Sequence, residues 1–169
     1  MFDASFLHPM IVHFPIALII VGFIAEILSF FWKKEFFSTS AFYLLILGSV
    51  GVIAAYITGQ NAGEGISEAG ALSRALETHE EAAELSLWII SVAAAVRIVL
   101  FIFKKYTGVF KAAGFGLFLL AVVSIVRTGH YGGQLVYKHA AGVQIDYGFT
   151  PQDNTNTSAG TESKNNDND

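Results

Sequence analysis

Long apolar runs, most of them ended by lysine or arginine, dominate the chain. Four of them reach or approach the roughly 20 residues that a transmembrane helix needs, at residues 11–32, 41–57, 82–103 and 109–126. None alternates apolar and polar residues as the strands of a membrane barrel do, and in lipid each segment must satisfy its own backbone hydrogen bonds. The pattern therefore predicts an all-α protein, an integral membrane four-helix bundle.

The end of the chain has a different composition. From Thr150 onward it consists mostly of Asn, Asp, Ser, Thr and Gly with almost no apolar residue, so it cannot bury enough surface to fold. We therefore expect one transmembrane domain over residues 1–149 and a disordered polar tail over residues 150–169.

Proline and glycine suggest where the first helix begins and the last one ends. Pro9 and Pro15 are expected to fix the entry to the first helix, since proline is favoured in a first helical turn. Gly132 and Gly133 are expected to end the fourth helix, because glycine adopts the left-handed conformation common at helix ends. Residues 135–143 would then fold back over the mouth of the bundle.

Lysine and arginine predict the orientation, because cytoplasmic loops carry an excess of them. The two short connections contain Lys33, Lys34, Lys104, Lys105 and Lys111, whereas the opposite side has Arg74, Arg127 and Lys138. Both connections should therefore be cytoplasmic, with both termini on the outer side. The first run ends in lysines instead of a cleavage site, so we expect a retained, multi-pass protein of the bacterial inner membrane.

Composition narrows the possible chemistry. The chain of 169 residues is 53% apolar and only 14% charged, against about 25% charged in soluble domains, which excludes an ordinary water-soluble globule. A net charge of −4 leaves no basic surface for nucleic acid. Because cysteine is absent, disulfides, iron–sulfur clusters and covalent c-type haem attachment are excluded. The histidines are then the most evident candidates for chemistry.

All five histidines are predicted to lie at the outer end of the bundle. They are His8, His13, His79, His130 and His139. Counted from the cytoplasmic lysines at about 1.5 Å per residue, His13 and His130 share one level, and His8 and His79 lie about 8 Å beyond it. His13 and His130 are thus the natural pair, and His139 could approach from above.

Three kinds of site fit such a cluster. Imidazole is an axial ligand of haem iron, so facing helices could hold haem b without cysteine. A non-haem transition metal held by His13, His79 and His130 is the second possibility. Four glutamates could add oxygen ligands to it: Glu77, Glu80, Glu81 and Glu84. In the third, the histidines only hydrogen-bond water, headgroups and loop carbonyls, in a structural or assembly protein without a cofactor.

Two charges are predicted inside the membrane. Glu26 and Arg97 each lie seven residues before the lysines that end their runs, so both are at about the same depth. An isolated charge there costs about 2.5–3.5 kcal/mol or more, and we expect an ion pair between the first and third helices. The alternative is that both side chains snorkel to the interface. His79 and Arg97 share a helical face, whereas His13 and Glu26 lie about 140° apart.

The same residues carry a family resemblance. Residues 7–18 read LHPMIVHFPIAL, and residues 129–139 read GHYGGQLVYKH. Together with His79, these motifs resemble a bacterial membrane family, domain of unknown function 2231, over about residues 5–147. The resemblance implies a four-helix membrane protein and no particular activity. The family's last motif commonly ends in His-Gly-Val-Gly-Val, where this chain has His-Ala-Ala-Gly-Val.

The leading hypothesis is a membrane electron-transfer subunit that holds haem b at the outer face. Its ligands would come from His13, His79 and His130, with His8 or His139. Such a subunit would exchange electrons with a quinone or an external redox protein and would not be an enzyme by itself. Membrane lipid is the partner that the pattern predicts directly, and no residue pattern indicates an oligomeric state.

Overall fold

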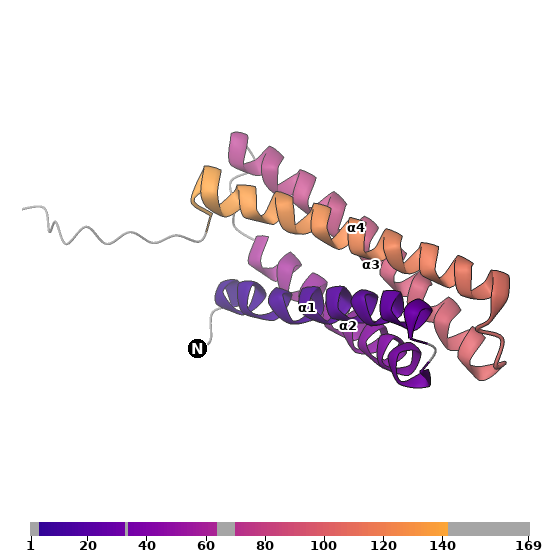
Figure 1. Ribbon diagram of the computed structural model, residues 1–169. Coiled ribbons are helices and arrows are strands. Elements are labelled where there is room, and N and C mark those ends of the chain that lie inside the picture. The colour runs from indigo at the N-terminus through magenta and orange to yellow at the C-terminus, as the bar shows by residue number, and fades with distance from the viewer. Residues whose placement is uncertain (1–3, 33, 64–69, 142–169) are drawn as a thin grey trace, which may run out of the picture.

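The four apolar runs form helices that extend well beyond the runs themselves. The computed structural model describes residues 4–32, 34–63 and 70–141, and these ranges contain no strand. The helices are α1 (Ala4–Phe31), α2 (Glu35–Gly63), α3 (Ala71–Ile102) and α4 (Gly108–His139), shown in Figure 1. Each is long and apolar enough to cross a membrane, so the predicted all-α fold of four spanning helices is confirmed. The predicted polar tail, residues 150–169, lies outside the described residues.

The glycines and prolines do not have the predicted effect on the helix ends. α4 continues through Gly132 and Gly133 to His139, and it ends where Ala140 takes a left-handed conformation with a φ of 51°. α1 begins before Pro9 and contains both prolines. A continuous helix satisfies its own backbone in lipid, and glycine and proline are more frequent in membrane helices than in soluble ones.

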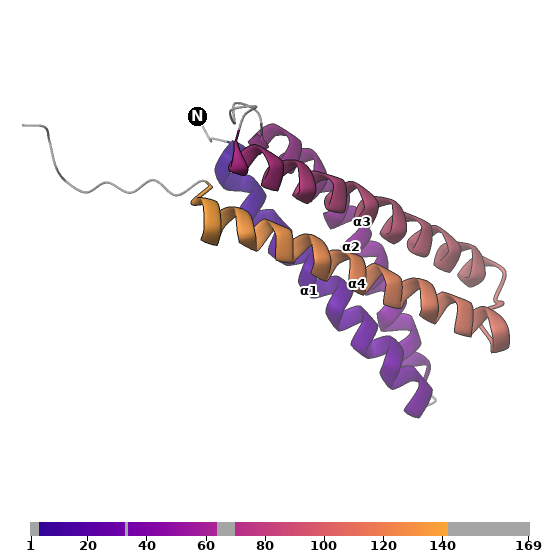
Figure 2. The same cartoon turned by 90° about the horizontal axis from the view of Figure 1, so that it is seen from above.

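The helices pair into two hairpins whose first members lie diagonally across the bundle. α1 packs along α2 and α3 packs along α4, and the hairpins meet at the α2–α3 and α1–α4 edges. The backbones of α1 and α3 make no contact in the described part of the chain. Figures 1 and 2 both show the start of α1 and the end of α4 at the same end of the bundle. We call this end the histidine end, and the other, which carries the 1–2 and 3–4 connections, the loop end.

The bundle has an apolar core, and unlike a soluble protein it also exposes many large apolar side chains on its outer surface. Large apolar side chains such as Val21, Leu47 and Val123 are exposed, as lipid contact allows. The buried polar and charged side chains are Glu26, Ser29, Ser49, Ser86, Arg97 and Ser124 among the described residues. Polar groups at membrane depth need partners inside the protein, and Ser29, Ser49 and Ser124 find theirs in carbonyl oxygens of their own helices.

Glycine allows α1 and α2 to approach closely. A Cβ atom added at Gly48 would lie 2.7 Å from Cγ1 of Ile19, and one at Gly51 would lie 3.0 Å from Cβ of Pro15. Ile19 is fully buried and cannot move aside without disturbing the core. Small residues of this kind are typical of membrane helix interfaces, so the two glycines set the spacing of the first hairpin.

The loop end contains the ion pair that the sequence predicts. Arg97 Nη2 donates to Glu26 Oε2 at 3.0 Å, and Glu26 is fully buried. The Tyr106 hydroxyl donates to Glu26 Oε1 at 2.6 Å, and Arg97 Nη2 also lies 3.1 Å from the carbonyl oxygen of Ser38. The network joins α1, α2, α3 and the 3–4 connection. Because both charged side chains are buried in this network, they do not snorkel to the interface, which was the alternative.

Gly48→Ala should weaken the packing of α1 against α2. The new methyl group would collide with Ile19, and overpacking of this kind costs about 1–3 kcal/mol. Gly116→Ala in α4 is the matched control, because a Cβ atom there meets nothing within 4 Å and alanine favours a helix by about 0.5–1 kcal/mol. In thermal melts of the full chain in detergent, Gly48→Ala should lower the melting temperature and Gly116→Ala should not. Equal shifts for both variants would show that the interface is not tightly packed.

Glu26→Gln should destabilise the fold by about 3–5 kcal/mol, because it leaves the buried Arg97 charge without a counter-charge. The double variant Glu26→Leu with Arg97→Met should recover much of that loss, since it removes both charges. Glu84→Gln, at an exposed position of α3, should have little effect. Denaturant unfolding in detergent measures all three, and a double variant no more stable than Glu26→Gln would count against a stabilising pair.

Candidate functional site

Two histidines from the diagonal helices meet at the histidine end. The rings of His8 in α1 and His79 in α3 have centroids 6.4 Å apart, and their planes are inclined by 72°. Both side chains are partly buried. Because the backbones of α1 and α3 do not touch, these side chains bridge the space between the two hairpins.

His8 is held by α2. Its Nδ1–H donates to the carbonyl oxygen of Ala55 at 2.9 Å, and Thr58 Oγ1 lies 3.3 Å from the same nitrogen. The ring lies against Gly59, where an added Cβ atom would be 2.9 Å from Cε1 of the imidazole. The missing side chain at Gly59 therefore provides the space that the ring fills.

His79 is held by α4 in the same manner. Its Nδ1–H donates to the carbonyl oxygen of Thr128 at 3.2 Å, and its ring lies over Gly132, where an added Cβ atom would be 3.1 Å from Cε1. The Thr128 hydroxyl in turn lies 2.8 Å from the carbonyl oxygen of Ala82 and 2.8 Å from the hydroxyl of Ser86. A polar link between α3 and α4 thus orients the second imidazole.

Both imidazoles are fixed in a tautomer that can bind a metal. A carbonyl oxygen only accepts hydrogen bonds, so Nδ1 carries the proton in His8 and in His79, and Nε2 keeps a lone pair. A backbone carbonyl on Nδ1–H is a common partner of metal-ligating histidine. Given a metal–nitrogen distance of about 2 Å, two imidazoles on one metal have ring centres roughly 5–6.5 Å apart, depending on the angle between the ligands. The observed separation of 6.4 Å is at the long end of this range.

The other histidines have different surroundings. His13 is exposed, and its Nδ1–H donates to the carbonyl oxygen of Pro9 in its own helix at 2.6 Å. His130 is also exposed, and its Nε2 accepts a hydrogen bond from the Gln134 amide at 2.8 Å. The structure therefore does not bring His13 and His130 together as the sequence predicts. His139 is the last residue of α4.

The helical repeat explains why His13 is not in the pair. His8 and His13 are five positions apart, which is about 140° around a helix. Because His8 faces α2, His13 must face away from the bundle. His8 and His79 thus lie at the same depth, as the residue count predicts. The predicted pairing of His13 with His130 fails because His13 lies on the wrong face of α1.

No group of three or more histidine or acidic side chains that could hold a metal occurs within residues 4–32, 34–63 and 70–141. The predicted metal ligands His13, His79 and His130 are accordingly not assembled. In the first half of α3, Glu77, Glu81 and Glu84 are exposed and Glu80 is partly buried. A metal at the His8–His79 pair would take two ligands from the described residues.

The equal spacing between a histidine and a charged residue in α1 and in α3 indicates the His8–His79 pair from the sequence. His8 lies 18 positions before Glu26, and His79 lies 18 positions before Arg97, which is five turns at about 3.6 residues per turn. Each helix therefore carries a histidine and a charge on one face, about 27 Å apart. Since α1 and α3 begin at the same end, the ion pair at the loop end brings the two histidines together at the other.

Other residues of the site carry no comparable signal. Nothing in the sequence indicates that Gly59 and Gly132 lie against imidazole rings, and the carbonyl groups of Ala55 and Thr128 act through the backbone. Their roles depend on which neighbouring helix faces each imidazole. Only the packed bundle decides this.

Comparison with known proteins agrees with the sequence motifs. A family model described as "Predicted membrane protein (DUF2231)" matches residues 5–145, which contain His8, His79 and their hydrogen-bond partners. No curated protein and no solved structure matches the chain. The chain therefore belongs to the domain of unknown function 2231 family of predicted membrane proteins.

Proposed function

We propose that this protein is a membrane electron-transfer subunit that binds haem b through His8 and His79 at the histidine end. The pair of imidazoles is the observation that carries the proposal. Their centroids are 6.4 Å apart, and each ring is held through Nδ1 by a carbonyl oxygen of a neighbouring helix. Both features suit imidazoles that would bind haem iron.

The number of available ligands favours haem over a bare metal ion. Structural zinc sites use four protein ligands and catalytic ones use three, whereas the described residues provide two imidazoles here and no group of three. In haem the porphyrin supplies four nitrogen ligands, so two histidines complete the coordination of the iron. A two-histidine site is therefore sufficient for haem b.

The residues around the pair have distinct roles in this proposal. Haem iron, when bound, supplies one-electron chemistry by changing its valence. His8 and His79 would each offer Nε2 to the iron, while the carbonyl oxygens of Ala55 and Thr128 fix the tautomer and increase the basicity of the rings. The polar link from Thr128 to α3 keeps the second ring in place.

We further propose that the histidine end lies outside the cytoplasm in a bacterial inner membrane. The connections at the loop end contain more lysine than the other side of the membrane, in keeping with the excess of basic residues in cytoplasmic loops. In this orientation both termini lie outside. The site would then exchange electrons with a quinone in the membrane or with an external redox protein, as a partner of an enzyme and not an enzyme by itself.

The full chain, expressed with an ample supply of haem and purified in detergent, should show a Soret band that sharpens on reduction. His8→Ala and His79→Ala should each lose most of this band. His130→Ala is the matched control, because it removes an exposed imidazole bonded only within α4. His79→Met should retain haem with a raised reduction potential, since a thioether ligand raises it, which a purely structural histidine would not produce.

The outcomes of this experiment separate the three hypotheses. A wild-type protein without a Soret band would contradict haem binding. Metal found by elemental analysis in such a protein, and lost in His79→Ala, would indicate a non-haem centre. Neither haem nor metal, with only the stability of the histidine variants reduced, would indicate a structural protein.

Gly59→Ala and Gly132→Ala should weaken haem binding without removing a ligand. The added methyl groups would lie 2.9 Å and 3.1 Å from the Cε1 atoms of His8 and His79, so the rings must shift. Changes in the support of a metal ligand commonly lower affinity about 10–100-fold. Gly133→Ala, where a Cβ atom meets nothing within 4 Å, is the control. Titration of haem into the haem-free protein measures the effect, and equal affinities for all three variants would argue against this site.

A further inference from the structure

The two hairpins share one pattern of buried and exposed positions. A residue of α1 and the residue 71 positions later in α3 have the same degree of burial along most of the two helices. Ile19 and Ile90 are both fully buried, and Val21 and Val92 are both exposed. The other buried pairs are Pro15 with Ser86, Gly22 with Ala93, Glu26 with Arg97 and Ser29 with Leu100. α1 and α3 therefore present matching faces to the interior of the bundle.

α2 and α4 match in the same way at a shift of 73 positions. The buried pairs are Leu45 with Phe118, Gly48 with Ala121 and Val52 with Ile125. At one of these positions the larger Ala121 replaces the glycine, in keeping with the closer packing of α1 on α2 than of α3 on α4. The two hairpins are therefore alike in register and differ in the spacing of their helices.

The contacts of the two imidazoles repeat at the same shifts. His79 lies 71 positions after His8, and its acceptor Thr128 lies 73 positions after Ala55. The glycines under the two rings are also 73 positions apart, namely Gly59 and Gly132. Each hairpin thus builds one contact from the same positions. An imidazole of its first helix lies on a carbonyl oxygen of its second helix and on a glycine four residues further along.

The two polar pairs show where an axis that relates the hairpins would run. In a two-fold arrangement, residue i of one copy contacts residue j of the other and the reverse, so a residue meets its own equivalent only at the axis. Glu26 and Arg97 are equivalent and are in contact at 3.0 Å at the loop end. His8 and His79 are equivalent, and their ring centroids are 6.4 Å apart at the histidine end. An axis through both pairs runs along the bundle.

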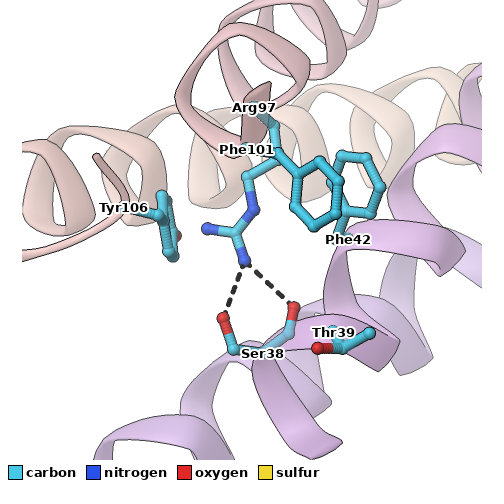
Figure 3. Close-up of a pocket in the computed structure, with 6 residues that line it drawn as sticks. All are labelled: Ser38, Thr39, Phe42, Arg97, Phe101 and Tyr106. Atoms are coloured by element: carbon cyan, nitrogen blue, oxygen red, sulfur yellow. Dashed lines mark hydrogen bonds between the residues drawn. The ribbon is translucent and has the colours of Figure 1, made fainter. Parts of the chain in front are cut away.

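The groups around the ion pair follow the same relation. Figure 3 shows the Arg97 guanidinium beside the Tyr106 ring, with two hydrogen bonds to Ser38 in the first turns of α2, which belongs to the other hairpin. Its equivalent Glu26 accepts a hydrogen bond from Tyr106, which lies just before α4 and also belongs to the other hairpin. Each charge therefore contacts its equivalent and the start of the second helix of the opposite hairpin.

We infer that α1–α2 and α3–α4 are two copies of one hairpin, related by an approximate two-fold axis along the bundle, and that the His8–His79 site on this axis contacts its ligand equally from both sides. In membrane transporters built from repeats, the ligand site lies at the interface between the repeats. The ligand must then offer the same chemistry to both imidazoles, as a metal centre with two open positions does. A site in which one imidazole binds the ligand and the other only donates a hydrogen bond would not fit. The part that concerns the ligand rests on the proposed function, whereas the two-fold arrangement does not.

Distances between spin labels test the two-fold arrangement without any ligand. The chain has no cysteine, so labels attach only at introduced cysteines in the full chain in detergent. Val21 and Val92 are equivalent, as are Ile53 and Val126, and all four side chains are exposed. The pair Val21→Cys with Val126→Cys and the pair Val92→Cys with Ile53→Cys should therefore give the same distance in pulsed electron paramagnetic resonance. If one hairpin were shifted along the axis by one turn, about 5.4 Å, one distance would lengthen and the other would shorten. Two such unequal distances would overturn the two-fold arrangement.

Replacing each imidazole in turn tests whether the site contacts its ligand equally. His8→Met and His79→Met should raise the reduction potential of bound haem by the same amount, since each variant replaces one of two equivalent imidazoles by a thioether. Gly59→Ala and Gly132→Ala, which keep both imidazoles, should weaken haem binding by the same factor. His130→Met, at an exposed histidine, is the control and should leave the potential unchanged.

The outcomes separate this inference from the proposed function. Different potentials for the two methionine variants, or haem lost from only one of them, would overturn equal contact while leaving haem binding in place. A wild type without a Soret band would contradict the haem proposal, and equal contact with the ligand would be rejected along with it. The label distances would still decide the two-fold arrangement in that case. Equal distances together with equal potentials would support the whole inference.

Discussion

The Glu26–Arg97 pair is the interaction on which the meeting of the two hairpins depends. A buried charge at membrane depth is tolerated only with a counter-charge and hydrogen bonds, so the faces of α1 and α3 that carry these residues must turn toward each other. The remaining groups of the network are then placed by the pair: Tyr106 donates to Glu26, and Ser38 accepts from Arg97. These polar bonds thus determine which helix faces pack together. Apolar packing in lipid cannot do so, because apolar side chains have no preference for one another over lipid tails.

The Glu26–Arg97 pair also influences the histidine end of the bundle, because the α-helix repeats regularly. Five turns separate each of its members from a histidine on the same face, so fixing the loop end determines which side chains meet at the histidine end. Between them lies an apolar core that includes Ile19 and Ile90, both fully buried. The bundle therefore has two polar sites, one at each end, separated by an apolar layer. A redox centre at the histidine end would serve partners on that side of the membrane only.

Glycine serves the same purpose at both ends, namely to let a ring lie directly on a neighbouring backbone. The imidazoles of His8 and His79 lie on Gly59 and Gly132, and the Tyr106 ring lies on Gly114, where an added Cβ atom would be 2.7 Å from Cε2. The guanidinium of Arg97 covers the other face of that tyrosine, with Cζ 3.1 Å from the ring centroid, a cation–π arrangement. These glycines carry no charge pattern of their own, yet they decide where the two imidazoles and the Tyr106 ring lie.

The sequence by itself determined the features that depend on local order along the chain. Hydropathy predicts four membrane helices, the distance from the lysines predicts the depth of Glu26 and Arg97, and the same count places His8 and His79 at one level. The tertiary structure decided which faces meet: it separates His13 from His130, continues α4 through Gly132, and aligns each imidazole with a carbonyl oxygen of a neighbouring helix. The depth of a residue in the membrane follows from the rise per residue within its own helix. The rotation of each helix and the choice of its neighbours follow from steric fit and polar pairing among all four, which no single segment encodes.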